Sequence, residues 1–241
     1  MLWAPLVGLA LGLTAEAVVA FVRFAIHGSS DHLLAAVVGV ATLGWLSRGL
    51  HLDGLMDTAD GLGSGRHGTE ALAVMSRSEV GALGVAAALM VVALQVAGLY
   101  SALSLGHGTL ALVGGATVAR LAASWSARPD LPAARPDGLG ATVAGTAPVP
   151  ALVALTVATG VVLAAAAQLD DDHVPGLGYA LEVALVVALV VGAGWFARHA
   201  VRRFGGMTGD VFGAVIEVSF TVFVISTSLQ PQWFHHLPGA G

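Results

Sequence analysis

Long apolar runs, separated by short polar stretches, make up most of the chain. Several windows of about 20 residues are apolar enough to cross the hydrocarbon core of a bilayer. The runs are continuous rather than alternating, so they predict helices and not the strands of a membrane barrel. The pattern therefore predicts an all-α fold, a polytopic transmembrane helical bundle of about seven spans. We place these spans at residues 3–22, 33–50, 80–105, 108–125, 148–168, 177–197 and 211–229.

Composition supports this prediction and narrows the chemistry. The 241 residues are 56% hydrophobic and only 10% charged, whereas soluble domains carry about 25% charged residues. No polar stretch is long enough for a separate soluble domain, so residues 1–241 are predicted to form a single integral-membrane domain. The chain has no cysteine and no lysine, which excludes disulfides, thiolate metal sites and the lysine-containing phosphate loop of nucleotide-binding enzymes. The first residues lack a basic segment, so we interpret them as a retained span.

The arginines predict the orientation in the membrane. Loops two, four and six of the predicted bundle contain or adjoin nine of the ten, and only Arg23 falls on the opposite side. Basic residues are enriched in cytoplasmic loops, so these three loops are predicted to face the cytoplasm. The nine are Arg48, Arg66, Arg77, Arg120, Arg128, Arg135, Arg198, Arg202 and Arg203.

An acidic motif, HLDGLMDTADGLGSG, occupies residues 51–65 of the second loop. Asp53, Asp57 and Asp60 follow an i, i+4, i+7 spacing, which places all three on one face of a helix. Like charges on one face repel each other unless a cation binds between them, and carboxylate oxygens suit Mg²⁺ or Mn²⁺. The alternative is a solvated helix end. His51 precedes the acids and is either a general base or a hydrogen-bonding interfacial histidine.

A second acidic pair, Asp210 and Glu217, lies in the last predicted span. An acid inside a span is a functional candidate, and packing of the two motifs would let their carboxylates share a two-metal site. The alternative is a helix-capping Asp210 and a Glu217 paired with an arginine. Gly205 and Gly206 precede this helix and would let main-chain amides approach an anion.

Arginines near both motifs indicate a substrate that carries phosphate. The glycine-containing loop at 134–146 either lines a substrate pocket or only connects two spans. The candidate phosphate-binding arginines are Arg66, Arg77, Arg135, Arg202 and Arg203.

Both motifs resemble those of cobalamin synthases, the adenosylcobinamide-GDP ribazoletransferase family. HLDGLMDTADGLGSG and GGMTGDVFGAVIE are similar to two characteristic stretches of that family, and WAPLVGLALG, MSRSEVGALGV and ARPDGLG follow in the expected order. Family members carry a further amino-terminal segment before the position where this chain starts, and many have an Asp-Ser-Arg order where this chain has MSRSEVG. No family role is therefore carried over to Arg77 or Glu79.

The resemblance implies a Mg²⁺-dependent enzyme of the bacterial cytoplasmic membrane. It would join adenosylcobinamide-GDP to α-ribazole, or to its 5′-phosphate, and release GMP. From the residues together with the resemblance, we assign catalysis to Asp57, Asp60 and His51, and substrate binding to Arg66, Arg135, Arg203, Gly205 and Gly206. The expected Mg²⁺ ligands are Asp53, Asp57, Asp60, Asp210 and Glu217. We expect no nucleic-acid partner, and the sequence leaves a homo-oligomer open.

Two other functions fit parts of the pattern. A CDP-alcohol phosphotransferase also uses membrane aspartates, but its signature has Ala-Arg after Asp-Gly, whereas Leu-Met-Asp follows Gly54 here. A secondary transporter would use the acids as cation sites, usually near the centre of the membrane. The acids of this chain gather at the predicted cytoplasmic ends of spans, which favours an enzyme.

Overall fold

The computed structural model describes residues 1–25, 31–167 and 177–228, with only the backbone given for residues 165–167 and 177–182. Within these ranges the chain is helical, and its single β feature is an isolated bridge between Ala133 and Met207. The all-α prediction is confirmed. The elements are α1 (Ala4–Ala25), α2 (His32–Leu46), α3 (Leu50–Gly63), α4 (Gly68–Met75), α5 (Ala82–Ser104), the π-helix η1 (Leu110–Gly114), α6 (Gly115–Trp125), α7 (Leu139–Val143), α8 (Val149–Ala167), α9 (Leu177–Phe204) and α10 (Gly209–Ser228).

Each predicted span coincides with a helix, although residues 168 and 229 at the ends of two predicted spans lie outside the described residues. In the described ranges, four helices are long and apolar enough to cross a membrane: α1, α5, α9 and α10. The bent pair α2–α3 raises this number to five if it forms one broken span. Shorter apolar helices, at Leu110–Trp125 and Val149–Ala164, occupy the other two predicted positions.

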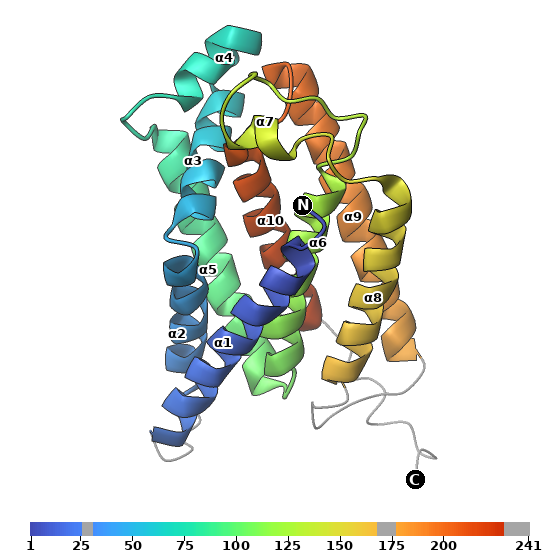
Figure 1. Ribbon diagram of the computed structural model, residues 1–241. Helices are drawn as coiled ribbons and strands as arrows, with labels where there is room; N and C mark the ends of the chain where they lie inside the picture. Colours follow the sequence, from blue (N-terminus) through green and yellow to red (C-terminus); the bar gives the residue numbers. More distant parts are fainter. Residues whose placement is uncertain (26–30, 168–176, 229–241) are drawn as a thin grey trace.

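Helix α10 forms the centre of the bundle. Of its most apolar 18-residue window 67% is buried, compared with 22–33% for the other three long apolar helices. It packs against α3, α5 and α6, and Figure 1 shows it enclosed between them. An acid on α10 is therefore held inside protein rather than against lipid, which is where ionisable groups of membrane helices are found.

A sharp break separates α2 from α3 just before the first acidic motif. Arg48 and Gly49 have φ angles of 54° and 70°, in the left-handed region that ends a right-handed helix. The axes of the two helices differ by 86° across this break. The break lets α3 leave the direction of α2 and lie against α10.

The loops that carry the arginines gather at one end of the bundle. Helices α3, α4 and α7 and the end of α9 lie together there (Figure 1). Main-chain hydrogen bonds join two of the loops, from the Met207 amide to the Pro132 carbonyl at 2.8 Å and from the Ala134 amide to the Met207 carbonyl at 2.9 Å. The fold thus brings the predicted cytoplasmic loops to a single surface.

Candidate active site

Helices α3 and α10 cross in backbone contact at the two acidic motifs. A Cβ added to Gly54 would lie 2.7 Å from the Cα of Asp210, and one added to Gly213 would lie 3.1 Å from the Cα of His51. Only glycine fits such an approach without displacing the partner helix. The crossing therefore sets the first acidic motif directly against the second.

Three acids meet at this crossing, Asp53, Asp57 and Asp210, and we call them the acid cluster. The negative charges of Asp210, Asp53 and Asp60 all act on the Asp57 carboxylate, and the charge of Asp53 also acts on Asp210. Asp57 and Asp210 are half-buried, while Asp53 is exposed. Carboxylates that repel each other in partly desolvated surroundings create a negative potential that attracts a cation.

The third acid of the first motif, Asp60, is held by main-chain amides. Its two carboxylate oxygens accept hydrogen bonds from the amides of Gly81, at 2.6 Å, and Gly84, at 2.9 Å. Gly81 is the N-cap of α5, where unpaired amides and the helix dipole favour a negative charge. Asp60 therefore fastens α3 to the start of α5, and its role as a metal ligand stays a prediction.

The acid cluster suits Mg²⁺ in its donor chemistry. In the described part of the chain, no group of three or more His, Asp or Glu side chains is close enough to hold a metal ion as placed. Mg²⁺ does not need such a group, because it keeps several waters and usually binds one or two carboxylates together with substrate phosphates. Oxygen donors that repel each other, open to solvent on the Asp53 side, fit this mode of binding.

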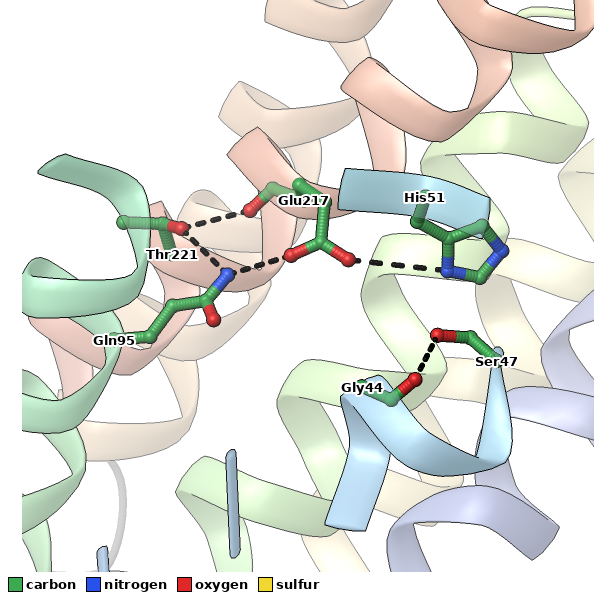
Figure 2. Close-up of polar contacts among 6 residues, drawn as sticks. All are labelled: Gly44, Ser47, His51, Gln95, Glu217 and Thr221. Atoms are coloured by element: carbon green, nitrogen blue, oxygen red, sulfur yellow. Dashed lines mark hydrogen bonds and ion pairs between the residues drawn. The ribbon is translucent and has the colours of Figure 1, made fainter. Parts of the chain in front are cut away.

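Glu217 lies apart from the acid cluster, and its role as a metal ligand stays a prediction. It lies seven residues after Asp210 on α10, which is about 10 Å along a helix axis. Its carboxylate accepts a hydrogen bond from Nε2 of Gln95 at 2.8 Å, and its main-chain carbonyl accepts one from Thr221 at 2.7 Å. Gln95 also donates to Thr221 at 3.1 Å. Figure 2 shows Glu217 between Gln95 and His51.

His51 faces Glu217. Its Nδ1 lies 3.9 Å from a Glu217 carboxylate oxygen (Figure 2). At this distance the two groups are in ion-pair range but not hydrogen-bonded, and the role of His51 as a general base stays a prediction. The residues that complete this group, Gln95 and Arg120, were not predicted as functional. Their sequence signal is a single polar or charged side chain within an otherwise apolar span.

Two pockets with charged residues in their walls open beside α4. The first has a volume of about 200 Å³ and is lined by Arg135, Asp137, Thr208 and Asp210 together with Gly138 and Gly140. It includes one member of the acid cluster, and residues of the loop at 134–146 form one wall, which fits the pocket-lining alternative for this loop. The second, of about 360 Å³, is lined by Asp60, Ser64, Arg66, Arg77 and Glu79.

Two of the predicted substrate-binding arginines, Arg135 and Arg203, already donate hydrogen bonds within the protein. Arg135 donates to the Leu72 carbonyl at 3.0 Å and to the Ser76 hydroxyl at 2.7 Å, at the end of α4, while its charge also acts on Asp210. Arg203 donates to the Leu62 carbonyl at 3.0 Å and lies 2.9 Å from a ring nitrogen of His67. Arg203 therefore caps the end of α3, and its role in substrate binding stays a prediction.

Gly205 and Gly206 serve the local fold. Gly205 has a φ of 84° at the end of α9, a left-handed conformation typical of glycine after a helix. Gly206 packs directly against the backbone of Ala133 and Ala134, and no side chain would fit there. Both glycines shape the turn that presents Asp210, and a direct contact with an anion stays a prediction.

Fold and site together define a multi-pass membrane protein with a carboxylate cluster and arginine-lined pockets at one end, a combination suited to a phosphate-bearing substrate. The chain belongs to the Cobalamin-5-phosphate synthase family, whose model matches residues 1–228.

Curated relatives agree with this family membership. The chain is 42% identical to the adenosylcobinamide-GDP ribazoletransferase of Frankia casuarinae, over 98% of this chain and 88% of the relative. It is 37% identical to a protein of the same name from Nocardioides sp., over 94% and 85% of the two chains. A third such relative, from Sinorhizobium sp., is 38% identical over 89% and 79%. No solved structure matches the chain.

Proposed function

We propose that this protein is an adenosylcobinamide-GDP ribazoletransferase. It joins adenosylcobinamide-GDP to α-ribazole, giving adenosylcobalamin and GMP, or to α-ribazole 5′-phosphate, giving adenosylcobalamin 5′-phosphate and GMP. The observation that carries this proposal is the match of nearly the whole chain to curated transferases of that name. The acid cluster and the adjoining pockets supply a site of the kind that the reaction requires.

Asp53, Asp57 and Asp210 are the residues we propose to hold Mg²⁺. The bound cation would neutralise the diphosphate of the activated substrate and stabilise charge on the departing GMP. Arginines in the two pockets could bind the phosphate oxygens of the substrate. Arg135 adjoins Asp210 in the first pocket, and Arg66 and Arg77 line the second pocket with Asp60.

The transfer forms a new phosphoester bond and breaks the phosphoanhydride bond of the diphosphate. The 5′-hydroxyl oxygen of α-ribazole forms a bond to the phosphorus nearest the cobinamide, and the bond from that phosphorus to the GMP oxygen breaks. The proton of the hydroxyl passes to a carboxylate of the acid cluster, and we assign this role to Asp57, which lies among the other acids. Positioning and charge neutralisation are the main demands of such a reaction.

The protein is a multi-pass membrane protein, and we propose that it lies in the bacterial cytoplasmic membrane with the acid cluster facing the cytoplasm. The support is the location of the arginine-bearing loops at one end of the bundle (Figure 1). Basic residues near the ends of spans mark the cytoplasmic side. Water-soluble substrates would then reach both pockets from the cytoplasm.

The test is a product assay on the purified full chain in detergent or lipid. Adenosylcobinamide-GDP, α-ribazole and Mg²⁺ are supplied, and GMP and the cobalamin product are followed by chromatography. We expect both products in equal amounts and neither after addition of EDTA. Product from CDP-diacylglycerol instead would favour a CDP-alcohol phosphotransferase. Uptake into proteoliposomes without product would favour a transporter.

A further inference from the structure

Arg120 is a buried positive charge that lies outside the acid cluster. Its side chain lies on α6 in the interior of the bundle, and the residue is only 6% exposed. Among the residues that the structure describes, the guanidinium forms no hydrogen bond and no direct ion pair. A buried, unpaired charge is costly, and charged groups within membrane helices are normally paired with one another.

Glu217 supplies the opposite charge. The charges of Arg120 and Glu217 act on each other, although they are not in direct contact. Together with His51 and Gln95, they line a cavity of about 20 Å³. A polar cavity of roughly 10–15 Å³ or more holds one water molecule when two to four polar groups surround it. This cavity meets both conditions.

The four polar groups come from four helices. His51 belongs to α3, Gln95 to α5, Arg120 to α6 and Glu217 to α10. His51 lies at the start of α3, two residues before Asp53, and its backbone is the surface on which Gly213 packs. Whatever fixes Glu217 and His51 therefore also fixes the crossing that forms the acid cluster.

We propose that Glu217 is a positioning residue, the buried counter-ion of Arg120 across a single bridging water, which holds α3 at its crossing with α10 through His51. It is not a ligand of the catalytic metal. The effect on turnover rests on the transferase function proposed above, whereas the pairing of the two charges does not.

A double-mutant cycle on the full chain tests the pairing. Glu217→Gln, Arg120→Met and the double variant are purified in detergent without metal or substrate, and their thermal unfolding midpoints are compared with that of the wild type. Each single variant leaves one buried charge without its counter-ion, so both midpoints are expected to fall. The double variant is expected to fall by clearly less than the sum of the two single changes. Additive changes would overturn the pairing.

Glu16 provides the matched control. It is another acid within a span, on α1, and its carboxylate lies 3.5 Å from the Thr109 hydroxyl. Glu16→Gln combined with Arg120→Met is expected to give additive changes. Should the single variants fail to fold, a folded double variant would show the same coupling, and loss of folding in the double variant as well would count against the pairing.

Turnover then separates positioning from metal binding. A displacement of about 1 Å at a reacting group can reduce a rate by roughly a hundredfold. Glu217→Gln is therefore expected to lower kcat by about tenfold to a hundredfold. The Mg²⁺ concentration that gives a half-maximal rate should not change. Adding Arg120→Met to this variant should partly restore kcat. A raised Mg²⁺ requirement that Arg120→Met does not relieve would make Glu217 a ligand. An inactive wild type would refute the transferase function, while the unfolding cycle would still decide the pairing.

Discussion

Asp60 accepts hydrogen bonds from two main-chain amides, those of Gly81 and Gly84 at the start of α5. The sequence spacing placed it with Asp53 and Asp57 on one helix face, which is correct. Spacing could not show that a third helix begins directly against that face. A carboxylate with both oxygens occupied by amides is first of all an anchor between two helices.

Removing the Asp60 carboxylate should destabilise the protein. Asp60→Ala leaves two partly buried amides without an acceptor, and each such loss costs about 1–3 kcal/mol. Asp60→Asn keeps one oxygen acceptor and should cost less. Chemical unfolding in detergent would measure both, with Glu79→Ala, an exposed acid of the same pocket, as the control. Wild-type stability of Asp60→Ala combined with a higher Mg²⁺ requirement would identify Asp60 as a metal ligand instead.

At the scale of whole elements, the crossing of α3 and α10 creates the site. It depends on Gly54, whose Cα faces the Asp210 backbone too closely for any side chain. Because α3 leaves α2 at an angle of 86°, this contact fixes where the acids of α3 lie relative to Asp210.

Gly54→Ala should therefore damage both stability and turnover. The added methyl group would push α3 away from α10, and overpacking of this kind costs about 1–3 kcal/mol. Gly160→Ala on α8 is the control, since nothing lies within 4 Å of a Cβ at that position, and alanine favours a helix by about 1 kcal/mol over glycine. Unfolding midpoints and GMP release are the measurements. A Gly54→Ala protein as stable and active as Gly160→Ala would show that the crossing tolerates separation.

Hydrophobic runs were sufficient to predict the apolar helices, because a chain in lipid must satisfy its main-chain hydrogen bonds within each span. The short helices α4 and α7 lie in predicted loops and were not predicted. The predicted acids and arginines of the two motifs and their loops, apart from Glu217, do lie at one end of the bundle. They are Asp53, Asp57, Asp60, Asp210, Arg66, Arg135 and Arg203. The grouping within that end could not be predicted. Asp210 and Glu217 share a helix face, yet they meet different neighbours, because α5 and α6 bring Gln95 and Arg120 to Glu217 alone. Such contacts depend on which helices pack together, and this cannot be predicted from the hydrophobic pattern of one sequence.

At the scale of the whole molecule, the candidate site lies at one end of the bundle. The end with α3, α4 and α7 carries the acid cluster and both pockets (Figure 1). The opposite end includes Ser104, the last residue of α5. If basic loops face the cytoplasm, the two ends lie on opposite sides of the membrane.

Single cysteines would test this orientation, since the natural chain contains none. Glu70 on α4 and Ser104 are both exposed and lie at opposite ends. In intact spheroplasts, a membrane-impermeant maleimide should label Ser104→Cys, and it should label Glu70→Cys only after the membrane is opened. The reverse pattern would place the acid cluster outside the cell.

The central claim is that the acid cluster at the α3–α10 crossing carries out the transfer. The most direct measurement is the rate of GMP release by Asp57→Asn at saturating Mg²⁺ and substrates, with Glu70→Gln, another acid at the same end, as the control. Asparagine preserves the shape of Asp57 while removing its charge and its ability to take a proton. We expect a loss of about a hundredfold or more, with an unfolding midpoint close to that of the wild type. If Asp57→Asn releases GMP within about twofold of the wild-type rate, the claim is contradicted, because losing one catalytic interaction usually costs far more than that.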